Sequence, residues 1–164
     1  PTKNPGYKTI SGGVTEQNRI DMIQLAIQDF PYFEFSDVEL RRDGATYTVD
    51  TLKELKVENS EDKFYFIMGA DSLYQIETWK DPDKILSMVN VLVATRNDSR
   101  SALDAQIDYL EDKYHGKIYH LNSPSIEISS NEIRKRNVSG QSIHFFLPEP
   151  VIDYIERNGL YEHK

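Results

Sequence analysis

The sequence predicts an α/β domain with a mostly parallel sheet that helices cover on both faces. Apolar runs of strand length occur at 64–68, 89–94 and 118–121, and segments with helical apolar spacing separate them. A strand buried on both faces reads as a continuous apolar run, and strands that alternate with helices are typical of a parallel sheet. With 164 residues in total, we expect one domain over 1–164.

The first expected element is a helix. Thr15 can cap it, and the apolar spacing ends near Phe30. A short extended segment is expected over 33–40, before Thr46 or Thr48 opens a second helix. The later elements follow in order: strand 64–68, a short helix around Leu73 and Ile76, a helix from Pro82, strand 89–94, helix 102–114, strand 118–121, a helix near Asn131 and a terminal helix from Pro148 to Asn158.

Composition excludes several classes of function. A net charge of −8 argues against binding nucleic acid, because neutralising phosphates needs clustered Lys and Arg. The chain has no cysteine, and its four histidines lack ligand spacing, so no metal site is predicted. No apolar run approaches the roughly 20 residues of a membrane span, so we expect no association with a membrane. The cytoplasm is the expected location.

The run from Ile128 to Arg134 contains a candidate anion site. Ser129 or Ser130 can cap a helix that begins around Asn131. The first amides of a helix lack intrahelical partners, and the helix dipole favours an anion there. Arg134 lies one turn further on, where its guanidinium can reach the same anion. The alternative is an ordinary capped surface helix.

Two further candidates follow predicted strands. Gly69 and Asp71 come directly after strand 64–68, where glycine allows a close approach and a carboxylate can accept bonds from ribose hydroxyls. The alternative for Asp71 is a helix cap. Arg96 follows strand 89–94 and can serve a phosphate or a base, or else lie in solvent.

An aromatic and a helix start complete the candidates. Trp79 is the only tryptophan and lies among polar residues, so its indole can stack on a flat ring, although core packing is the commoner fate of tryptophan. The helix start near Thr48 has free amides suited to a carboxylate, with simple Thr capping as the alternative.

The order of these segments resembles the bacterial nicotinate-nucleotide adenylyltransferases. That resemblance implies a Rossmann-like nucleotidyltransferase fold that joins ATP and nicotinate mononucleotide, with Mg²⁺, into deamido-NAD and pyrophosphate in NAD biosynthesis. It covers nearly the whole chain, from Pro1 to Tyr161. The motifs that carry it are Tyr47-Thr48-Val49-Asp50-Thr51-Leu52, Gly69-Ala70-Asp71, Trp79, Val93-Ala94-Thr95-Arg96, Ile128-Ser129-Ser130-Asn131-Glu132-Ile133-Arg134, Phe146-Leu147-Pro148 and Asn158-Gly159-Leu160-Tyr161.

The resemblance assigns the nucleotide contacts of the middle of the chain. Gly69 and Asp71 would hold the ribose of the adenylyl donor. Trp79 would stack on the nicotinate ring, and the backbone amides of Thr48 and Lys80 would receive the nicotinate carboxylate.

The remaining assignments concern ATP. Ser130 and Arg134 would grip the phosphates as the catalytic pair, with Ser129 beside them, and Arg96 would lie near the adenosine. Such chemistry needs positioning and charge neutralisation and no protein nucleophile.

Three features depart from the family pattern. Asn131 stands where threonine is usual, and Lys80 replaces a frequent tyrosine. The Thr/His-x-Gly-His motif is absent from the sequence. We therefore expect the first two strands and the helix between them to be missing, and the 164-residue chain alone to be inactive unless another chain supplies them.

Two alternatives stay open at this point. The same transfer could act on nicotinamide mononucleotide or phosphopantetheine. Without its histidine motif, the chain could instead be a non-catalytic nucleotide-binding module. The expected partners are ATP and nicotinate mononucleotide, and a homo-oligomer with a second copy of the chain stays open.

Overall fold

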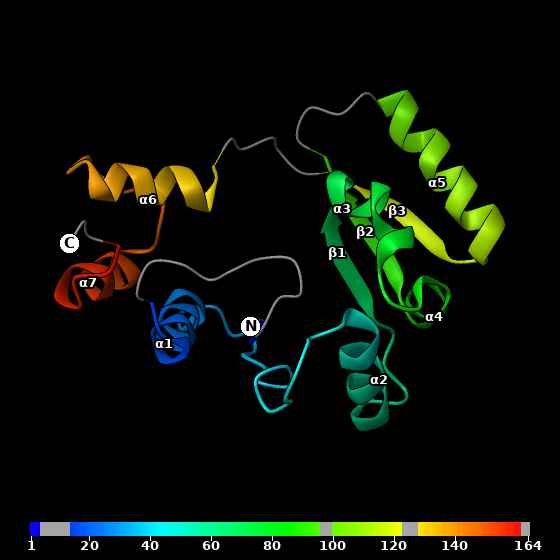
Figure 1. Cartoon of the computed structure of the whole chain (residues 1–164), viewed down its shortest axis with the longest axis horizontal. Coiled ribbons are helices and arrows are strands. Elements are labelled where there is room, and N and C mark those ends of the chain that lie inside the picture. The colour runs from blue at the N-terminus through cyan, green and yellow to red at the C-terminus, as the bar shows by residue number, and fades with distance from the viewer. Residues whose placement is uncertain (4–13, 96–99, 123–127, 162–164) are drawn as a thin grey trace. The chain divides into compact units, whose positions relative to one another are not determined.

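The computed structural model describes residues 1–3, 14–95, 100–122 and 128–161. They belong to two compact units (Figure 1). Unit 1 takes in Pro1–Thr46 and Ile128–Lys164, and unit 2 takes in Tyr47–Glu127. Each unit is described by itself below. No helix in the described ranges is long and apolar enough to cross a bilayer.

A parallel sheet forms the centre of unit 2. Its strands are β1 (Tyr65–Gly69), β2 (Asn90–Ala94) and β3 (Lys117–Leu121), in the order β1-β2-β3. Met68 lies opposite Val93, so the carboxyl ends of β1 and β2 are level. The α/β class and the parallel pairing predicted from the sequence are therefore confirmed.

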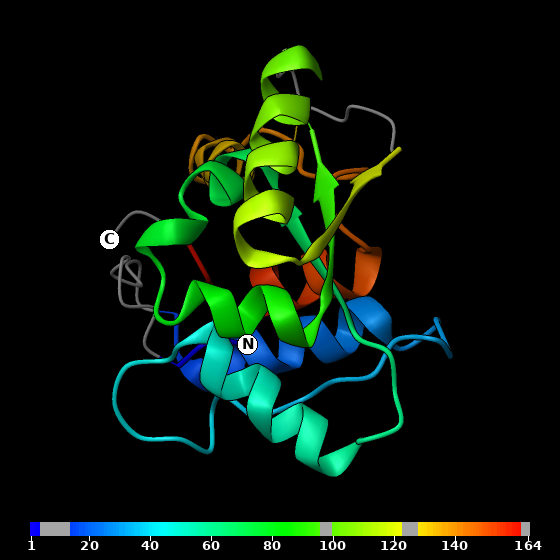
Figure 2. The same ribbon diagram turned by 90° about the vertical axis from the view of Figure 1, so that its right-hand side faces the viewer.

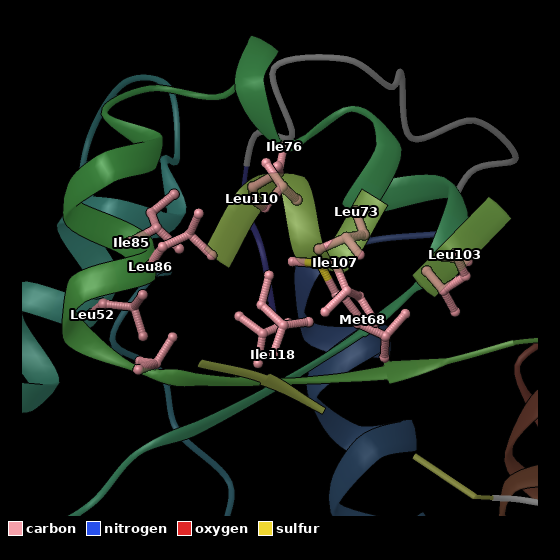
Figure 3. Close-up of a cluster of buried hydrophobic side chains, with 14 of the residues drawn as sticks. Leu52, Met68, Leu73, Ile76, Ile85, Leu86, Leu103, Ile107, Leu110 and Ile118 are labelled. Atoms are coloured by element: carbon pink, nitrogen blue, oxygen red, sulfur yellow. The ribbon is translucent and has the colours of Figure 1, made fainter. Parts of the chain in front are cut away.

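The helices of unit 2 share one hydrophobic core with the sheet. Leu73, Ile85 and Leu110 are fully buried in it, and Figure 3 shows the labelled side chains of this cluster gathered on one side of the strands. In Figure 2, the long helix α5 runs beside the strands. The helical elements are α2 (Thr48–Glu58), α3 (Ala70–Tyr74), the 3₁₀ helix η1 (Ile76–Thr78), α4 (Pro82–Met88) and α5 (Arg100–Tyr114).

Strand β1 differs from its prediction. Phe66 and Met68 contact the core cluster, whereas Tyr65 and Ile67 are 51% and 61% exposed. Successive side chains of a strand point to opposite faces, and the helices of unit 2 cover the face that carries Met68. The prediction that this strand is buried on both faces is therefore wrong.

Unit 1 is built around helix α7 (Glu149–Arg157). Its buried residues Val151, Ile152 and Ile155 pack with side chains of α1 (Glu16–Ile27). The predicted Thr15 cap is confirmed, because its side chain accepts a bond from the Asn18 amide at 3.1 Å. Helix α6 (Ser130–Val138) also contributes Ile133 to this cluster.

The predicted extended segment of unit 1 ends in a turn at residues 38–40, and residues 33–37 have no regular structure. Residues 33–40 form no strand, and Phe33 is exposed. Val38 and Leu40 are buried, and the Leu40 amide closes a turn on the Asp37 carbonyl at 2.7 Å. Only the last two apolar residues of the pattern, Val38 and Leu40, therefore face inwards, and they do so from a turn.

Candidate functional site

Gly69 and Asp71 lie at the carboxyl end of β1, as predicted. Gly69 precedes helix α3 with φ −79° and ψ 158°, and a Cβ placed on it would meet nothing within 4 Å. Neither backbone conformation nor packing therefore requires glycine there, and open space lies before the backbone. Asp71 lies in the first turn of α3 with its side chain exposed, so it is not the helix cap considered as its alternative.

Trp79 directly follows η1. Its indole is half-buried, packs against the core cluster and meets the Phe66 ring edge-on, with centroids 6.3 Å apart and an interplanar angle of 73°. Core packing is therefore confirmed on one side of the indole, and stacking of its accessible part on a ligand ring stays a prediction.

The Lys80 side chain joins the segment that follows η1 to the start of α2. Its Nζ lies 3.0 Å from Asp50 Oδ2 and 4.6 Å from the centroid of the Tyr47 ring. Tyr47 gives α2 no side-chain cap, and within the described residues neither the Thr48 amide nor the Lys80 amide has a hydrogen-bond partner. Thr capping is therefore wrong for this helix, and two free amides belong to segments that Lys80 connects.

Glu77 is a residue that the sequence interpretation missed. Its Oε1 accepts hydrogen bonds from Lys113 Nζ at 2.6 Å, Tyr114 OH at 2.9 Å and Tyr109 OH at 3.2 Å. The bond from Lys113, followed by that from Tyr114, lowers the pKa of the Glu77 carboxyl, and the Glu77 carboxylate raises the pKa of Lys113 and Tyr114. The carboxylate is therefore held in its charged form.

Ser129 is the cap of helix α6. Its Oγ accepts a bond from the Glu132 amide at 3.1 Å, and the helix begins at Ser130. The hydroxyl of Ser129 is thus already engaged. The Ser130 and Asn131 amides come first in the helix, where backbone N–H groups lack intrahelical partners.

We expect Ser129→Ala to lower the free energy of unfolding by about 1 kcal/mol, as loss of an N-cap does. Urea denaturation followed by circular dichroism measures the change. Ser139→Ala is the matched control, since Ser139 follows the same helix and its side chain caps nothing. Equal midpoints for the two variants would contradict the capping role.

Ser130 and Arg134 line one cavity of about 360 Å³ inside unit 1. Its other polar lining residues are Arg19, Asn137 and Tyr161, and the rest of the lining is mostly apolar. The Arg134 guanidinium lies 5.9 Å from the centroid of the Tyr161 ring. No carboxylate pairs with Arg134 in the described part of the chain, so its charge is available to an anion.

Arg19 is the second residue that the sequence interpretation missed. Its Nη1 donates to the Thr2 carbonyl at 2.7 Å, and its buried Nε has no partner among the residues described. A neutral carbonyl leaves the guanidinium charge uncompensated. Both Arg19 and Arg134 therefore line the cavity. In the sequence, an arginine placed among the apolar residues of α1 is the signal that could have indicated Arg19.

The predicted site residues divide between the two units. Thr48, Gly69, Asp71, Trp79 and Lys80 belong to unit 2, and the serines with Arg134 belong to unit 1. Arg96 lies outside the described residues. Within the described ranges, no three His, Asp or Glu side chains are grouped as a metal site.

Comparisons with known proteins agree on one family. Residues 1–136 match the cytidylyltransferase-like family model. A probable nicotinate-nucleotide adenylyltransferase of Lachnoclostridium phytofermentans is 43% identical over 162 residues, which is 98% of this chain and 81% of the relative. A Clostridium botulinum protein of the same description is 39% identical over 163 residues, covering 99% and 80%.

Solved structures share the fold at low identity. Plasmodium falciparum nicotinic acid mononucleotide adenylyltransferase complexed with NaAD has a TM-score of 0.73 at 22% identity, over 97% of this chain and 78% of that one. The same enzyme complexed with APC gives 0.69 at 23% identity, over 90% and 76%.

Proposed function

This chain belongs to the nicotinate-nucleotide adenylyltransferases, within the cytidylyltransferase-like family, and we propose that it transfers the adenylyl group of ATP to nicotinate mononucleotide. The products are deamido-NAD and pyrophosphate. The expected Rossmann-like nucleotidyltransferase fold agrees with its α/β structure and its structural relatives.

One observation in unit 2 carries the choice of acceptor. Lys80 connects the loop after Trp79 to the start of α2, and each segment presents an amide without a partner in the described chain. Paired N–H donors suit a carboxylate, and a helix start adds a favourable dipole. The half-exposed indole of Trp79, in the residue next to Lys80, offers a flat surface to the ring that bears that carboxylate.

The donor nucleotide would use the other candidates. Gly69 leaves open space at the carboxyl end of β1, and the exposed Asp71 carboxylate can accept bonds from ribose hydroxyls. Ser130 and Arg134 would hold phosphates from the first two turns of α6, with Ser129 fixing the start of that helix. The role of Arg96 near the adenosine stays a prediction.

The reaction is a single displacement. A phosphate oxygen of nicotinate mononucleotide forms a bond to the α-phosphorus of ATP, and the bond from that phosphorus to the bridging oxygen breaks to release pyrophosphate. Arg134 would neutralise charge that gathers on the leaving phosphates. Mg²⁺ would enter with ATP and would supply further neutralisation of the phosphate charge. The single domain over 1–164 and the cytoplasmic setting stay predictions.

Pyrophosphate release with matched acceptors tests the proposal. Because the chain alone is expected to be inactive, this and every kinetic measurement below uses the chain joined to a Thr/His-x-Gly-His segment of the family. We expect kcat/KM for nicotinate mononucleotide to exceed that for nicotinamide mononucleotide by at least about tenfold, because an amide cannot replace a carboxylate that accepts two N–H bonds. Phosphopantetheine serves as the unrelated acceptor. Equal use of the acid and the amide would remove the carboxylate site, and no release with any acceptor would favour a non-catalytic nucleotide-binding module.

A further inference from the structure

Two sets of side-chain contacts, called fastenings below, hold the loop that carries Trp79, one on each side of the indole in the sequence. Glu77 lies two residues before Trp79 and bonds to helix α5, whereas Lys80 lies directly after it and bonds to helix α2. Both fastenings lie within unit 2. The segment 77–80, which runs from the end of η1 through Trp79 to Lys80, is called the Trp79 loop below.

The first fastening is a cluster of three donors on one oxygen. Lys113, Tyr114 and Tyr109 all donate to Glu77 Oε1, at 2.6, 2.9 and 3.2 Å. The Lys113 ammonium also donates to the Tyr109 hydroxyl at 2.8 Å. A single exposed ion pair contributes little, but linked hydrogen bonds support one another, so this cluster holds its geometry better than an isolated pair.

The second fastening combines an ion pair and a ring contact. The Lys80 ammonium lies between the Asp50 carboxylate, at 3.0 Å, and the Tyr47 ring, at 4.6 Å. Both partners belong to the start of α2, on either side of the Thr48 amide. Lys80 therefore ties the segment that carries its own amide to the helix start that carries the Thr48 amide.

We propose that Glu77 and Lys80 are positioning residues that hold the Trp79 indole and the carboxylate-binding amides in the arrangement that nicotinate mononucleotide requires. The inference rests on the proposed function. A loop that is ordered before the ligand arrives does not lose its freedom on binding, and this raises affinity without a new contact. Loosening the loop should therefore weaken binding of the acceptor and leave the ATP contacts unchanged.

Fluorescence tests the fastening without any substrate, because Trp79 is the only tryptophan in the sequence. Acrylamide quenching and emission anisotropy are measured for the wild type, Glu77→Ala, Lys80→Met and the double variant. Removing either set of contacts should raise the acrylamide quenching constant of Trp79 by roughly 1.5- to 2-fold and lower its anisotropy. The reason is that a loop without these contacts exposes its indole and lets it move. Glu77→Gln keeps an acceptor oxygen, so its quenching constant and anisotropy should lie between those of the wild type and those of Glu77→Ala.

Kinetics then test the consequence for the acceptor. We expect KM for nicotinate mononucleotide to rise roughly 5- to 10-fold in each single variant, while KM for ATP changes less than about twofold. Asp104→Ala is the matched control, because Asp104 lies on α5 as Lys113 does but pairs with His120, at 2.7 Å, and not with Glu77. Its quenching and KM values should equal those of the wild type.

The two readouts separate the failures. Unchanged quenching and anisotropy in the double variant would overturn the positioning roles, whatever the activity. Raised quenching with an unaltered KM would show a fastening without a role in binding, and would also overturn them. A wild type that does not use nicotinate mononucleotide would overturn the proposed function while the quenching result still stands on its own.

Discussion

Replacing Arg134 with alanine should lower kcat/KM for ATP about 100-fold, the usual loss when a charge-stabilising donor is removed from a transition state. The reason is the setting of its guanidinium. It lines the cavity of unit 1 together with Ser130, and no carboxylate of the described chain compensates its charge. Initial rates of pyrophosphate release at varied ATP concentration give the value.

Two variants make the Arg134 result specific. Lys135→Ala removes a neighbouring charge from the same helix, but Lys135 is exposed and does not line the cavity, so its kcat/KM should stay within about twofold of the wild type. Arg134→Lys keeps the charge without the two-pronged donor and should fall between the two. A loss of less than about twofold in Arg134→Ala would remove this arginine from the site.

Trp79→Ala should raise KM for nicotinate mononucleotide by roughly 30-fold, because stacking of a base on an aromatic side chain is worth about 1–3 kcal/mol by alanine substitution. The indole is half-buried, with one edge against Phe66. Trp79→Phe retains a smaller ring and should recover much of the affinity. Steady-state kinetics with saturating ATP measure both variants.

The control for Trp79 is Tyr32→Ala. Tyr32 is an exposed aromatic of unit 1, so its loss should leave both KM values unchanged. Thermal unfolding must accompany the measurement, since Trp79 also contributes to the core of unit 2. A parallel rise in the KM of both substrates would indicate a general loss of structure and would contradict a stacking role.

Local patterns predicted most of the elements. The strands around Val91 and Ile118 are confirmed, as are the Thr15 cap and the helix that Pro82 begins, because each depends on neighbouring residues. The burial of β1 was predicted wrongly, because an apolar run does not state which of its faces the helices cover.

The candidate site was predictable only where a motif is contiguous. Gly69 with Asp71 and Ser129 through Arg134 are short runs whose position at a strand end or helix start follows from sequence. The bond of Glu77 with Lys113 joins residues 36 positions apart, and no local pattern encodes that pairing. Arg19 likewise lies on a helix that was predicted from the spacing of its apolar residues. Only the fold shows that Arg19 lines a cavity.

The division of the chain has a consequence for synthesis on the ribosome. Unit 2 is one continuous stretch, Tyr47–Glu127, whereas unit 1 needs both ends, because α1 packs against α7. A chain emerges at about 5–20 residues per second, and contiguous parts fold as they appear. The strands described in unit 2 are therefore made before α7 exists, and the α1 side chains that pack with α7 must wait for that helix.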